Sequence, residues 1–589
     1  MFDYHTAMLR PVIASLLAIV LLAGGSGLAA QQSYRTLNDK FPPPPEMTIE
    51  EWTVRAAHLK ERILATAGLL PAPEKTPLNP VIFGEVQRAD YTVSKVYFES
   101  LPGFYVTGNL YKPAGSGPFP AILSPHGHWA YGRLENSEHA SVPGRAINLA
   151  RQGFVVFTYD MIGYNDSRQL PHTFGGLREH LWGLSLAGLQ LWNSIRALDF
   201  LESLRYVRRN AIGATGASGG GTQTFLLAAV DERVAAAAPV NMISLQMQGG
   251  CLCENQPGLR LDTTNVEIAA TIAPRPLLMV SATGDWTANT LELEYPAVRK
   301  IYALAGAEDR VHGERFDAPH NYNKQSREAM YTWMARWLGG AAAGTKVSER
   351  GFTPEPLADA LVFHRRAMPE GALTPAALTD VWIASAKRQL SSTDPAIHRR
   401  ALLHALGYSA TDVAAATAPD SKAARSVVFA GSDPELERLL DNNGFSVHRV
   451  AFTAFDTAAA KKVNHFDTYN RTAASARVAD IVAAVRARPG AALVAVAGAG
   501  PEGLLASAIA PARVAIVDAE AFKASDDAEF LERLFIPGLR RAGDLQTAAE
   551  MAGARLVVHN AGDLSLRAGR TERTRLGARE ILEALRAPR

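Results

Sequence analysis

The sequence predicts an α/β fold: a mostly parallel sheet flanked by helices, followed by a second, smaller α/β domain. Strand-like apolar runs alternate with amphipathic helical stretches, as in 154–160, 181–204 and 234–240. Apolar residues make up 47% of the chain and charged residues 20%, which supplies ample material for packed cores. The 589 residues far exceed the roughly 100 to 200 of a typical domain, so we expect more than one domain.

The first 30 residues have the pattern of a secretory signal peptide. Arg10 precedes an apolar run over 12–23, and small residues follow up to Ala30. The run is shorter than the ~20 residues needed to span a bilayer. We therefore expect a secreted or periplasmic protein with no membrane contact after cleavage, and a retained transmembrane anchor is the alternative.

The first domain is expected over 31–340. A proline-rich tether at 41–45 leads into a helical stretch at 49–70, and alternating apolar residues from Tyr91 to Tyr111 predict antiparallel strands. The next apolar run ends close to a His-Gly-His sequence at 126–128. This order predicts a sheet that begins antiparallel and continues parallel.

A sharp turn at Ser218 is the strongest sign of chemistry. Ser218 is the centre of a G-x-S-x-G sequence, flanked by Gly216 and Gly220, between a strand-like and a helix-like run. A strand-to-helix turn of this kind leaves almost no room for neighbouring side chains and exposes the central hydroxyl. Ser218 is therefore the predicted nucleophile.

A serine hydroxyl needs a histidine as base and an acid that orients this histidine. In α/β proteins with such a strand-to-helix nucleophile turn, the acid comes after the serine in the chain and the histidine comes last. Asp285 ends an apolar strand at a Gly-Asp turn, and His320 lies in a loop before a helix, so both reach the carboxyl edge of the sheet. Asp317 competes as the acid, and a helix N-cap is the alternative role of Asp285. His139, His172 and His180 precede Ser218 and would break the order.

The oxyanion formed during acyl transfer needs backbone donors. The amide of Gly219 is the first candidate, and the amide of His128 or Trp129, after the compact Gly127, is the second. His126 and His128 could instead form a metal pair, but no third ligand is evident nearby in the sequence. No metal or cofactor is therefore expected.

The only two cysteines, Cys251 and Cys253, are separated by one residue. That spacing strains an ordinary disulfide, and two thiols alone make an incomplete zinc site. Packing of small residues in a loop and a strained disulfide both stay open.

These motifs, together with the stretch 160–167, resemble the acetyl xylan esterase and dienelactone-hydrolase-like group of α/β hydrolases, which is related to prolyl oligopeptidase catalytic domains. The resemblance implies an α/β-hydrolase fold and hydrolysis of small-molecule or polysaccharide esters, such as acetylated plant polysaccharide. The chain has serine where dienelactone hydrolases have cysteine, and it lacks a β-propeller. A non-catalytic carbohydrate-binding or structural protein, and a serine peptidase or amidase, are the alternatives.

The second domain is expected over 366–589, after a linker at 341–365. A strand followed by Gly498, Gly500 and Gly503 has the G-x-G-x-x-G outline of a dinucleotide site. That turn comes late in the domain, however, and parallels with the first domain predict a degenerate hydrolase-like copy with Gly500 at the nucleophile position.

The role of the second domain stays open among a buttress of the active site, a carbohydrate-binding unit and a homodimer surface. The formal net charge of +2 is spread without a basic block, so there is no electrostatic reason to expect a nucleic-acid partner.

Overall fold

The computed structural model describes residues 33–414 and 425–587, and the chain from Tyr34 onward forms one compact unit. The expected signal peptide at 1–30 lies outside the described residues. Within the described part, no helix is both long and apolar enough to cross a membrane.

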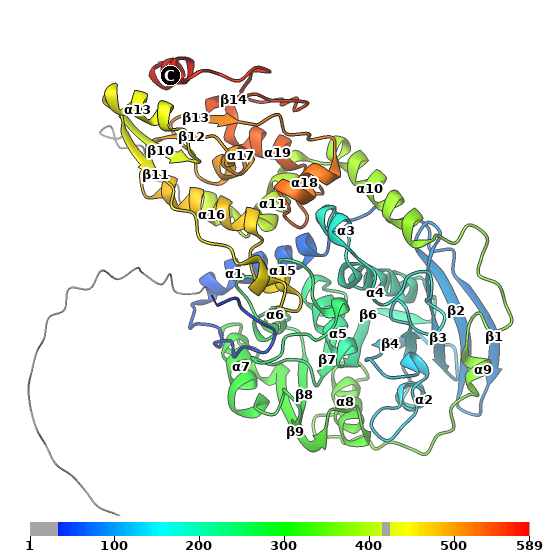
Figure 1. Cartoon of the computed structure of the whole chain (residues 1–589). Helices are drawn as coiled ribbons and strands as arrows, with labels where there is room; N and C mark the ends of the chain where they lie inside the picture. The colour runs from blue at the N-terminus through cyan, green and yellow to red at the C-terminus, as the bar shows by residue number, and fades with distance from the viewer. Residues whose placement is uncertain (1–32, 415–424, 588–589) are drawn as a thin grey trace, which may run out of the picture. The chain divides into compact units, whose positions relative to one another are not determined.

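A nine-stranded sheet forms the first half of the fold (Figure 1). Its order is β1-β2-β3-β5-β4-β6-β7-β8-β9, antiparallel from β1 to β5 and parallel from β5 to β9, which confirms the predicted change of direction. The strands are β1 Val81–Gln87, β2 Tyr91–Leu101, β3 Phe104–Pro113, β4 Phe119–Pro125, β5 Val155–Tyr159, β6 Val207–Ala217, β7 Val234–Val240, β8 Leu277–Gly284 and β9 Val311–Pro319.

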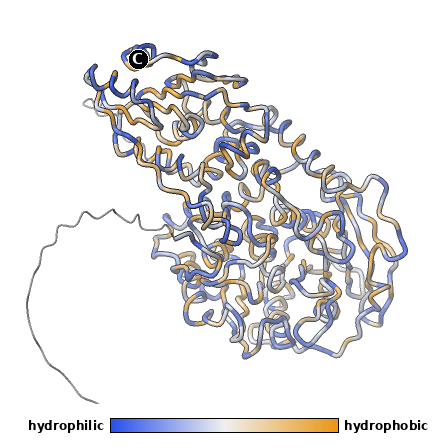
Figure 2. The backbone as a smooth tube through the Cα atoms, in the orientation of Figure 1, coloured by the Kyte–Doolittle hydropathy of each residue, from blue (hydrophilic) through white to orange (hydrophobic). Residues whose placement is uncertain are grey.

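Helices cover both faces of this sheet because successive strand residues point to opposite sides. Ile122 of β4 packs in the core beneath α2 and α8, whereas its neighbour Leu123 packs in the core beneath α1, α4 and α5. Figure 2 shows hydrophobic residues recurring along these elements. The helices are α1 Ile49–Thr66, α2 Val142–Arg151, α3 Leu177–Leu181, α4 Leu186–Ser203, α5 Gly219–Val230, α6 Asn265–Ala270, α7 Tyr295–Leu304 and α8 Lys324–Trp337.

The second sheet is parallel throughout, in the order β11-β10-β12-β13-β14-β15. When the strands of this sheet are counted from one in chain order, the order is 2-1-3-4-5-6. The six parallel strands of the first sheet, β5-β4-β6-β7-β8-β9, have the same order when they are counted in the same way. The second region therefore repeats the parallel part of the first, as expected of a degenerate copy. The strands are β10 Ser426–Ala430, β11 Ser446–Arg449, β12 Ala492–Ala495, β13 Ala515–Asp518, β14 Leu556–His559 and β15 Arg570–Thr571.

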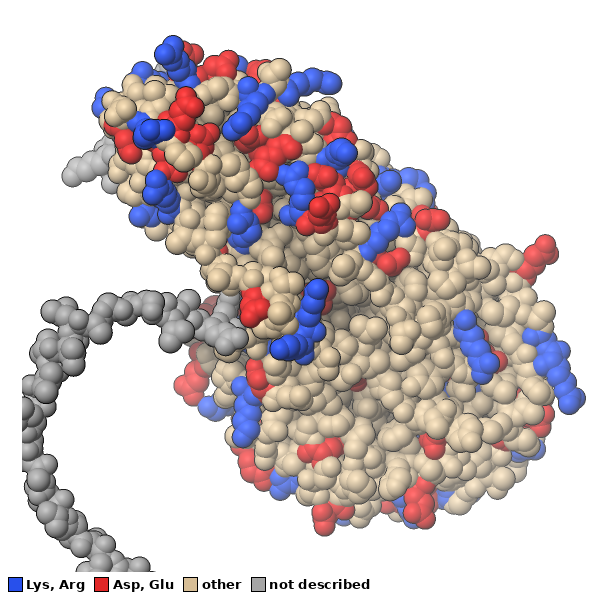
Figure 3. All heavy atoms as spheres, viewed as in Figure 1, with Lys and Arg blue, Asp and Glu red and all other residues tan. Residues whose placement is uncertain are grey.

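Helices also cover both faces of the second sheet, with α11, α16, α17 and α19 in one core and α13 and α20 in the other. Figure 3 shows charges of both signs interspersed on the viewed face of the molecule. The helices are α9 Leu357–Ala360 before this region, then α10 Pro375–Ser392, α11 Pro395–Ala405, α12 Ala410–Ala414, α13 Pro434–Asn442, α14 Thr457–Ala460, α15 Phe466–Tyr469, α16 Ala473–Arg486, α17 Gly500–Ile509, α18 Asp527–Arg533, α19 Asp544–Ala552 and α20 Ala578–Arg586.

The position assigned to Gly500 is wrong by one residue. Gly500 is the first residue of α17, just as Gly219 is the first residue of α5, so Ala499 takes the place that Ser218 has in the first region. Ala499 has φ −134°, whereas Ser218 has φ +56°. Position 499 thus has neither a nucleophile nor the positive φ of Ser218, and the left-handed non-glycine residue of this turn is Ala497, with φ +45°.

The glycine-rich turn after β12 is occupied by an acid of the chain itself. One oxygen of the Glu520 carboxylate accepts hydrogen bonds from the amides of Gly498 at 2.6 Å and Gly500 at 3.4 Å. Asp518, the acid at the end of the next strand, accepts a hydrogen bond from Asn560 at 2.9 Å and lies 3.2 Å from Arg575. The glycine-rich turn and the acid after it, which a dinucleotide would contact, therefore both have partners within the protein itself.

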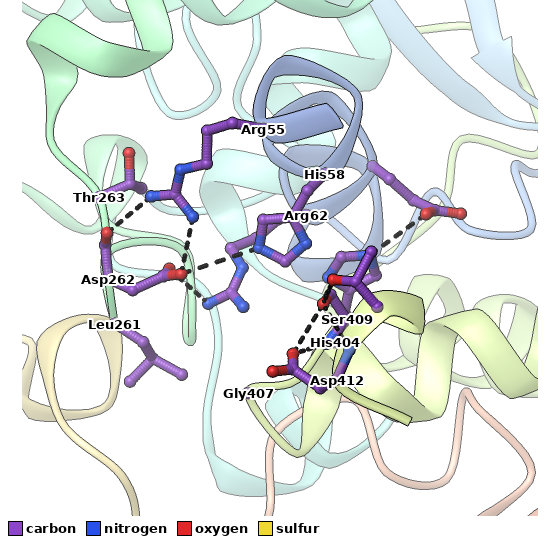
Figure 4. A network of polar contacts seen from close by, with 12 residues as sticks. Arg55, His58, Arg62, Leu261, Asp262, Thr263, His404, Gly407, Ser409 and Asp412 are labelled. Atoms are coloured by element: carbon purple, nitrogen blue, oxygen red, sulfur yellow. Dashed lines mark hydrogen bonds and ion pairs between the residues drawn. The ribbon is translucent and has the colours of Figure 1, made fainter. Parts of the chain in front are cut away.

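Helix α1 joins the two regions through a polar network (Figure 4). Asp262 lies 3.0 Å from Arg55 and 3.0 Å from the buried guanidinium of Arg62, both on α1. On the other side of α1, Glu61 pairs with His404 of α11 at 3.4 Å. Burial opposes ionisation of Asp262, but His58 and the two arginines outweigh it and lower the pKa of this carboxyl.

A buried ion pair fixes the segment expected as a linker, 341–365, to the first region. The guanidinium of Arg133 lies 3.3 Å from Asp160 and 2.5 Å from Asp166, and all three side chains are buried. Asp166 also accepts hydrogen bonds from the backbone amides of Val362 at 2.8 Å and Phe363 at 2.9 Å. The end of this segment is therefore packed against the loop after β5.

Replacing Arg133 by methionine should lower the free energy of unfolding by about 3 to 5 kcal/mol, because it leaves two carboxylates buried without a cation. Urea denaturation followed by tryptophan fluorescence measures this change. The matched control is Arg299→Met, whose exposed pair with Glu308 at 3.8 Å should contribute less than about 1 kcal/mol. Equal effects of the two substitutions would contradict the structural role of the buried pair.

Candidate active site

Ser218 lies in a one-residue turn between β6 and α5. Its backbone has φ +56° and ψ −128°, a conformation that non-glycine residues rarely adopt, and its side chain is half-buried. A Cβ on Gly216 would lie 2.6 Å from the carbonyl oxygen of Gly220, and a Cβ on Gly220 would lie 2.7 Å from that of His126. The two flanking glycines are therefore required by close backbone packing.

Asp285 and His320 meet at the same edge of the sheet. The Nδ1 atom of His320 lies 2.7 Å from Oδ2 of Asp285, whose side chain is buried. The other oxygen of Asp285 accepts hydrogen bonds from the amide and the hydroxyl of Thr287, at 2.7 and 2.5 Å. The carboxylate is thus held in place and aimed at the imidazole.

The tautomer of His320 follows from this contact. With Nδ1–H donating to Asp285, Nε2 carries the lone pair, and Nε2 is buried without a hydrogen-bond partner among the described residues. The indole of Trp286 packs on the imidazole, with ring centroids 4.4 Å apart. The ring is fixed, and its free nitrogen is available to accept a proton.

The loop that carries His320 is anchored to the strand that carries Ser218. The hydroxyl of Tyr322 lies 2.5 Å from that of Thr215 in β6, and Asn241 donates a hydrogen bond to the carbonyl of Asn321 at 3.2 Å. Within the described chain no hydrogen bond joins Ser218 to His320, which is common before substrate binds, because such bonds tighten in the complex.

Asp317, the competing acid, has a different partner. Its carboxylate accepts a hydrogen bond from the hydroxyl of Thr283 at 2.6 Å, and its side chain is exposed. His320 pairs with Asp285 instead, so the geometry favours Asp285.

The loop after β4 approaches the Ser218 turn closely. A Cβ on Gly127 would lie 3.2 Å from Cβ of Ser218 and 2.8 Å from the carbonyl oxygen of Ala217. The ring of Trp129 in this loop has its centroid 6.1 Å from that of His320. This loop therefore borders both the serine and the histidine.

Of the three backbone amides expected as oxyanion donors, two have no hydrogen-bond partner among the described residues. Gly219, as the first residue of α5, has an N–H without a partner in the helix. The amide of Trp129 already donates to the carbonyl of Gly127 at 2.8 Å, whereas the amide of His128 has no partner in the part of the chain described. The structure therefore favours the amides of Gly219 and His128 over that of Trp129 as oxyanion donors.

The two histidines of the 126–128 loop have separate roles. His126 is fully buried, accepts a hydrogen bond from the amide of Met161 at 2.9 Å and has Nδ1 2.7 Å from the carbonyl of Gly127. Burial lowers its pKa to about 3, so it is neutral. It joins the loops after β4 and β5 and does not form a metal pair with His128.

The side chain of His128 instead meets three residues that the sequence did not connect with it: His172, Cys251 and Cys253. Both cysteines are free thiols in the structure. The sequence distances of 44 and more than 120 residues gave no sign of the cluster, which only the sheet topology brings together.

Together, the sheet order, the strained serine turn and the carboxylate–imidazole pair define an α/β hydrolase. No family model matches the chain. A Bacillus subtilis protein named "Putative hydrolase YtaP" is 27% identical over 291 residues, which cover 45% of this chain and 95% of that protein.

Among solved structures, Methylesterase BT1017 is 31% identical with a TM-score of 0.51, and the match covers 59% of this chain and 78% of the methylesterase. The chain therefore belongs to the family of α/β-hydrolase esterases that includes Methylesterase BT1017. A "putative acetyl xylan esterase (BF1801)" from Bacteroides fragilis is 18% identical with a TM-score of 0.40, covering 48% of this chain and 80% of that one.

Asp285→Asn should lower kcat for p-nitrophenyl acetate by about 10⁴-fold, because an amide beside Nδ1 favours the wrong tautomer of the imidazole. The matched control is Asp317→Asn, which should leave kcat within about twofold of the parent. Steady-state kinetics of both variants measures the difference. A large loss in Asp317→Asn with little loss in Asp285→Asn would exchange the two assignments.

Proposed function

We propose that the protein is a secreted or periplasmic serine esterase that hydrolyses carboxylic esters of carbohydrates through an acyl-enzyme. The observation that carries this proposal is the Asp285–His320 pair, 2.7 Å apart, with its unpaired Nε2 at the sheet edge where Ser218 lies in a strained turn.

In the first half of the reaction, Oγ of Ser218 attacks the ester carbonyl and His320 accepts its proton at Nε2. Asp285 holds the imidazole through Nδ1 and stabilises its positive charge. The amides of Gly219 and His128 donate hydrogen bonds to the oxyanion. The alcohol then leaves with the proton from His320.

In the second half, water attacks the acyl-enzyme while His320 accepts a proton from it. The tetrahedral intermediate uses the same two donors, and the acid departs as Ser218 regains its proton.

Aromatic rings beside the site support a carbohydrate substrate. Trp129 and Trp286 flank the imidazole of His320, and the side chain of Tyr131, on the same loop as Trp129, is 56% exposed. Ring faces of this kind are apolar surfaces with polar edges, which suit the C–H faces and hydroxyls of a sugar. The family relationship to a methylesterase adds methyl esters to the acetyl esters expected from the sequence.

Ser218→Ala should reduce kcat/KM for p-nitrophenyl acetate by several orders of magnitude, because the activated nucleophile is lost. Ser137→Ala, at an exposed position before α2, is the control and should retain the parent rate. Intact mass spectrometry after treatment with a sulfonyl fluoride should show one adduct on the parent and none on Ser218→Ala. Undiminished hydrolysis by Ser218→Ala would refute the serine mechanism.

The substrate class is tested separately with the parent enzyme. Acetylated xylan, methyl-esterified uronic acid polymers, glucuronoyl esters and a peptide p-nitroanilide are compared by release of acetate, methanol, alcohol or p-nitroaniline. We expect kcat/KM to be highest for a sugar ester and the anilide to be cleaved least. Preferential cleavage of the anilide would favour a peptidase or amidase.

A further inference from the structure

Four metal-ligating side chains converge beside the proposed active site. The Nε2 atom of His128 lies 3.1 Å from Sγ of Cys253 and 3.3 Å from Nε2 of His172. Cys251 completes the group, and all four ligand atoms lie within 4.8 Å of one another. Three of these residues are half-buried and Cys253 is buried.

Two of the separations among these ligand atoms are close to those within a tetrahedral zinc site, and the others are at most 4.8 Å. With Zn–N of about 2.0 Å and Zn–S of about 2.3 Å, the edges of such a tetrahedron are about 3.3 to 3.8 Å. The His128–Cys253 separation of 3.1 Å lies just below this range and the His128–His172 separation of 3.3 Å lies at its lower end. The ligand atoms are thus near coordination geometry before any ion is placed among them.

The tautomer of His172 also suits a metal ligand. Nδ1 of His172 lies 2.6 Å from the carbonyl oxygen of Ile162, so it carries the proton and leaves the lone pair on Nε2. This Nε2 faces Nε2 of His128. A hydrogen bond from the outer nitrogen of an imidazole to a carbonyl is the usual support of a metal-binding histidine.

The loop that holds the two thiols is fixed by its own hydrogen bonds. The carboxylate of Glu254 accepts hydrogen bonds from the amides of Gly250 at 2.8 Å and Cys251 at 3.0 Å. The side chain of Asn255 donates to the carbonyl of Cys251 at 2.8 Å. The thiols therefore extend from a constrained turn, even though their Cys-x-Cys spacing is tighter than that of most zinc sites.

The neighbouring loop is shaped around His172. A Cβ on Gly163 would lie 2.8 Å from Cβ of His172, so this close approach requires glycine. The ring of Tyr164 lies edge-on to the imidazole of His172, with centroids 5.0 Å apart. His172 is thus held toward His128 and the thiols.

We propose that His128, His172, Cys251 and Cys253 bind one Zn²⁺ ion as a closed structural site. Soft thiolate and imidazole ligands select zinc among the common divalent ions. Two thiolates balance the charge of the ion, and binding releases the two thiol protons. Four protein ligands leave no open position, so the ion does not activate water.

The ion would join three loops that surround Ser218. His128 follows β4, His172 follows β5, and the two cysteines follow β7, whereas the serine turn follows β6. Cε1 of His128 lies 2.6 Å from the place where a Cβ of Gly219 would be. The zinc therefore positions the loop whose His128 amide is the proposed oxyanion donor.

The first test is metal content. Protein purified without added chelator, measured by inductively coupled plasma mass spectrometry, should hold about one zinc per chain. The double variant Cys251→Ser/Cys253→Ser and the variant His172→Gln should hold less than about a tenth of that amount, because each loses ligands. His139→Gln, at an exposed histidine outside the cluster, is the control and should keep the parent's content.

The coordination is tested with Co²⁺ in place of zinc. The parent should show the intense visible bands of tetrahedral Co²⁺ and a near-ultraviolet thiolate charge-transfer band, and the double cysteine variant should lose the charge-transfer band. A parent chain that binds neither ion while circular dichroism shows it folded would overturn the proposal. A Cys251–Cys253 disulfide, seen as a mass two hydrogens below the reduced chain, would overturn it as well.

The consequence for catalysis rests on the proposed esterase function, whereas the metal content does not. Zinc removal from the parent should lower kcat for p-nitrophenyl acetate more than it raises KM, because the oxyanion donor is displaced. Normal metal content in an enzyme without esterase activity would refute the proposed function alone. Full kcat after complete zinc removal would refute the positioning role.

Discussion

Close backbone packing around the turn between β6 and α5 is the constraint on which the site depends. Ser218 keeps its left-handed conformation because Gly216, Gly220 and Gly127 let three stretches of backbone approach without side chains between them. The strain of such a residue is of the order of 1 to 3 kcal/mol, and it persists only where the surroundings enforce it. The same packing brings the loop after β4 over the serine, and with it the backbone donor of His128.

The remaining parts of the site are arranged around that turn by the order of the sheet. Parallel strands end at one edge, so Asp285 after β8 and His320 after β9 reach the side on which Ser218 follows β6. Further contacts then remove the remaining freedom: Thr287 holds the acid, Trp286 covers the imidazole, and Tyr322 fixes its loop to β6. The pair is preorganised before substrate arrives.

The order of the fold and the residues of the pair could be read from the sequence, because both depend on local patterns. Alternating strands and helices predict a parallel sheet, and a Gly-Asp turn at the end of an apolar strand predicts an acid at the sheet edge. The hydrogen bond from the Trp129 amide to the carbonyl of Gly127 could not be predicted. It depends on a local backbone turn, which the types of the side chains do not indicate.

The grouping of His128 with His172 and the two cysteines was hidden for a different reason. Its members come from three loops, and only the three-dimensional order of β4, β5 and β7 brings them together. The sequence predicts the register of the second turn one residue away from its place, because glycine at 498, 500 and 503 allows several equivalent alignments with the first region. Helix α17 begins at Gly500 and removes that ambiguity.

The carboxylate of Glu520 makes the glycine-rich turn after β12 a poor site for a free anion. An acid tethered at the end of the adjacent strand β13 competes with any free anion at an effective concentration of the order of millimolar. A phosphate that binds more weakly than this is excluded by mass action. A free anion could therefore occupy this turn only by displacing Glu520 from the amides of Gly498 and Gly500.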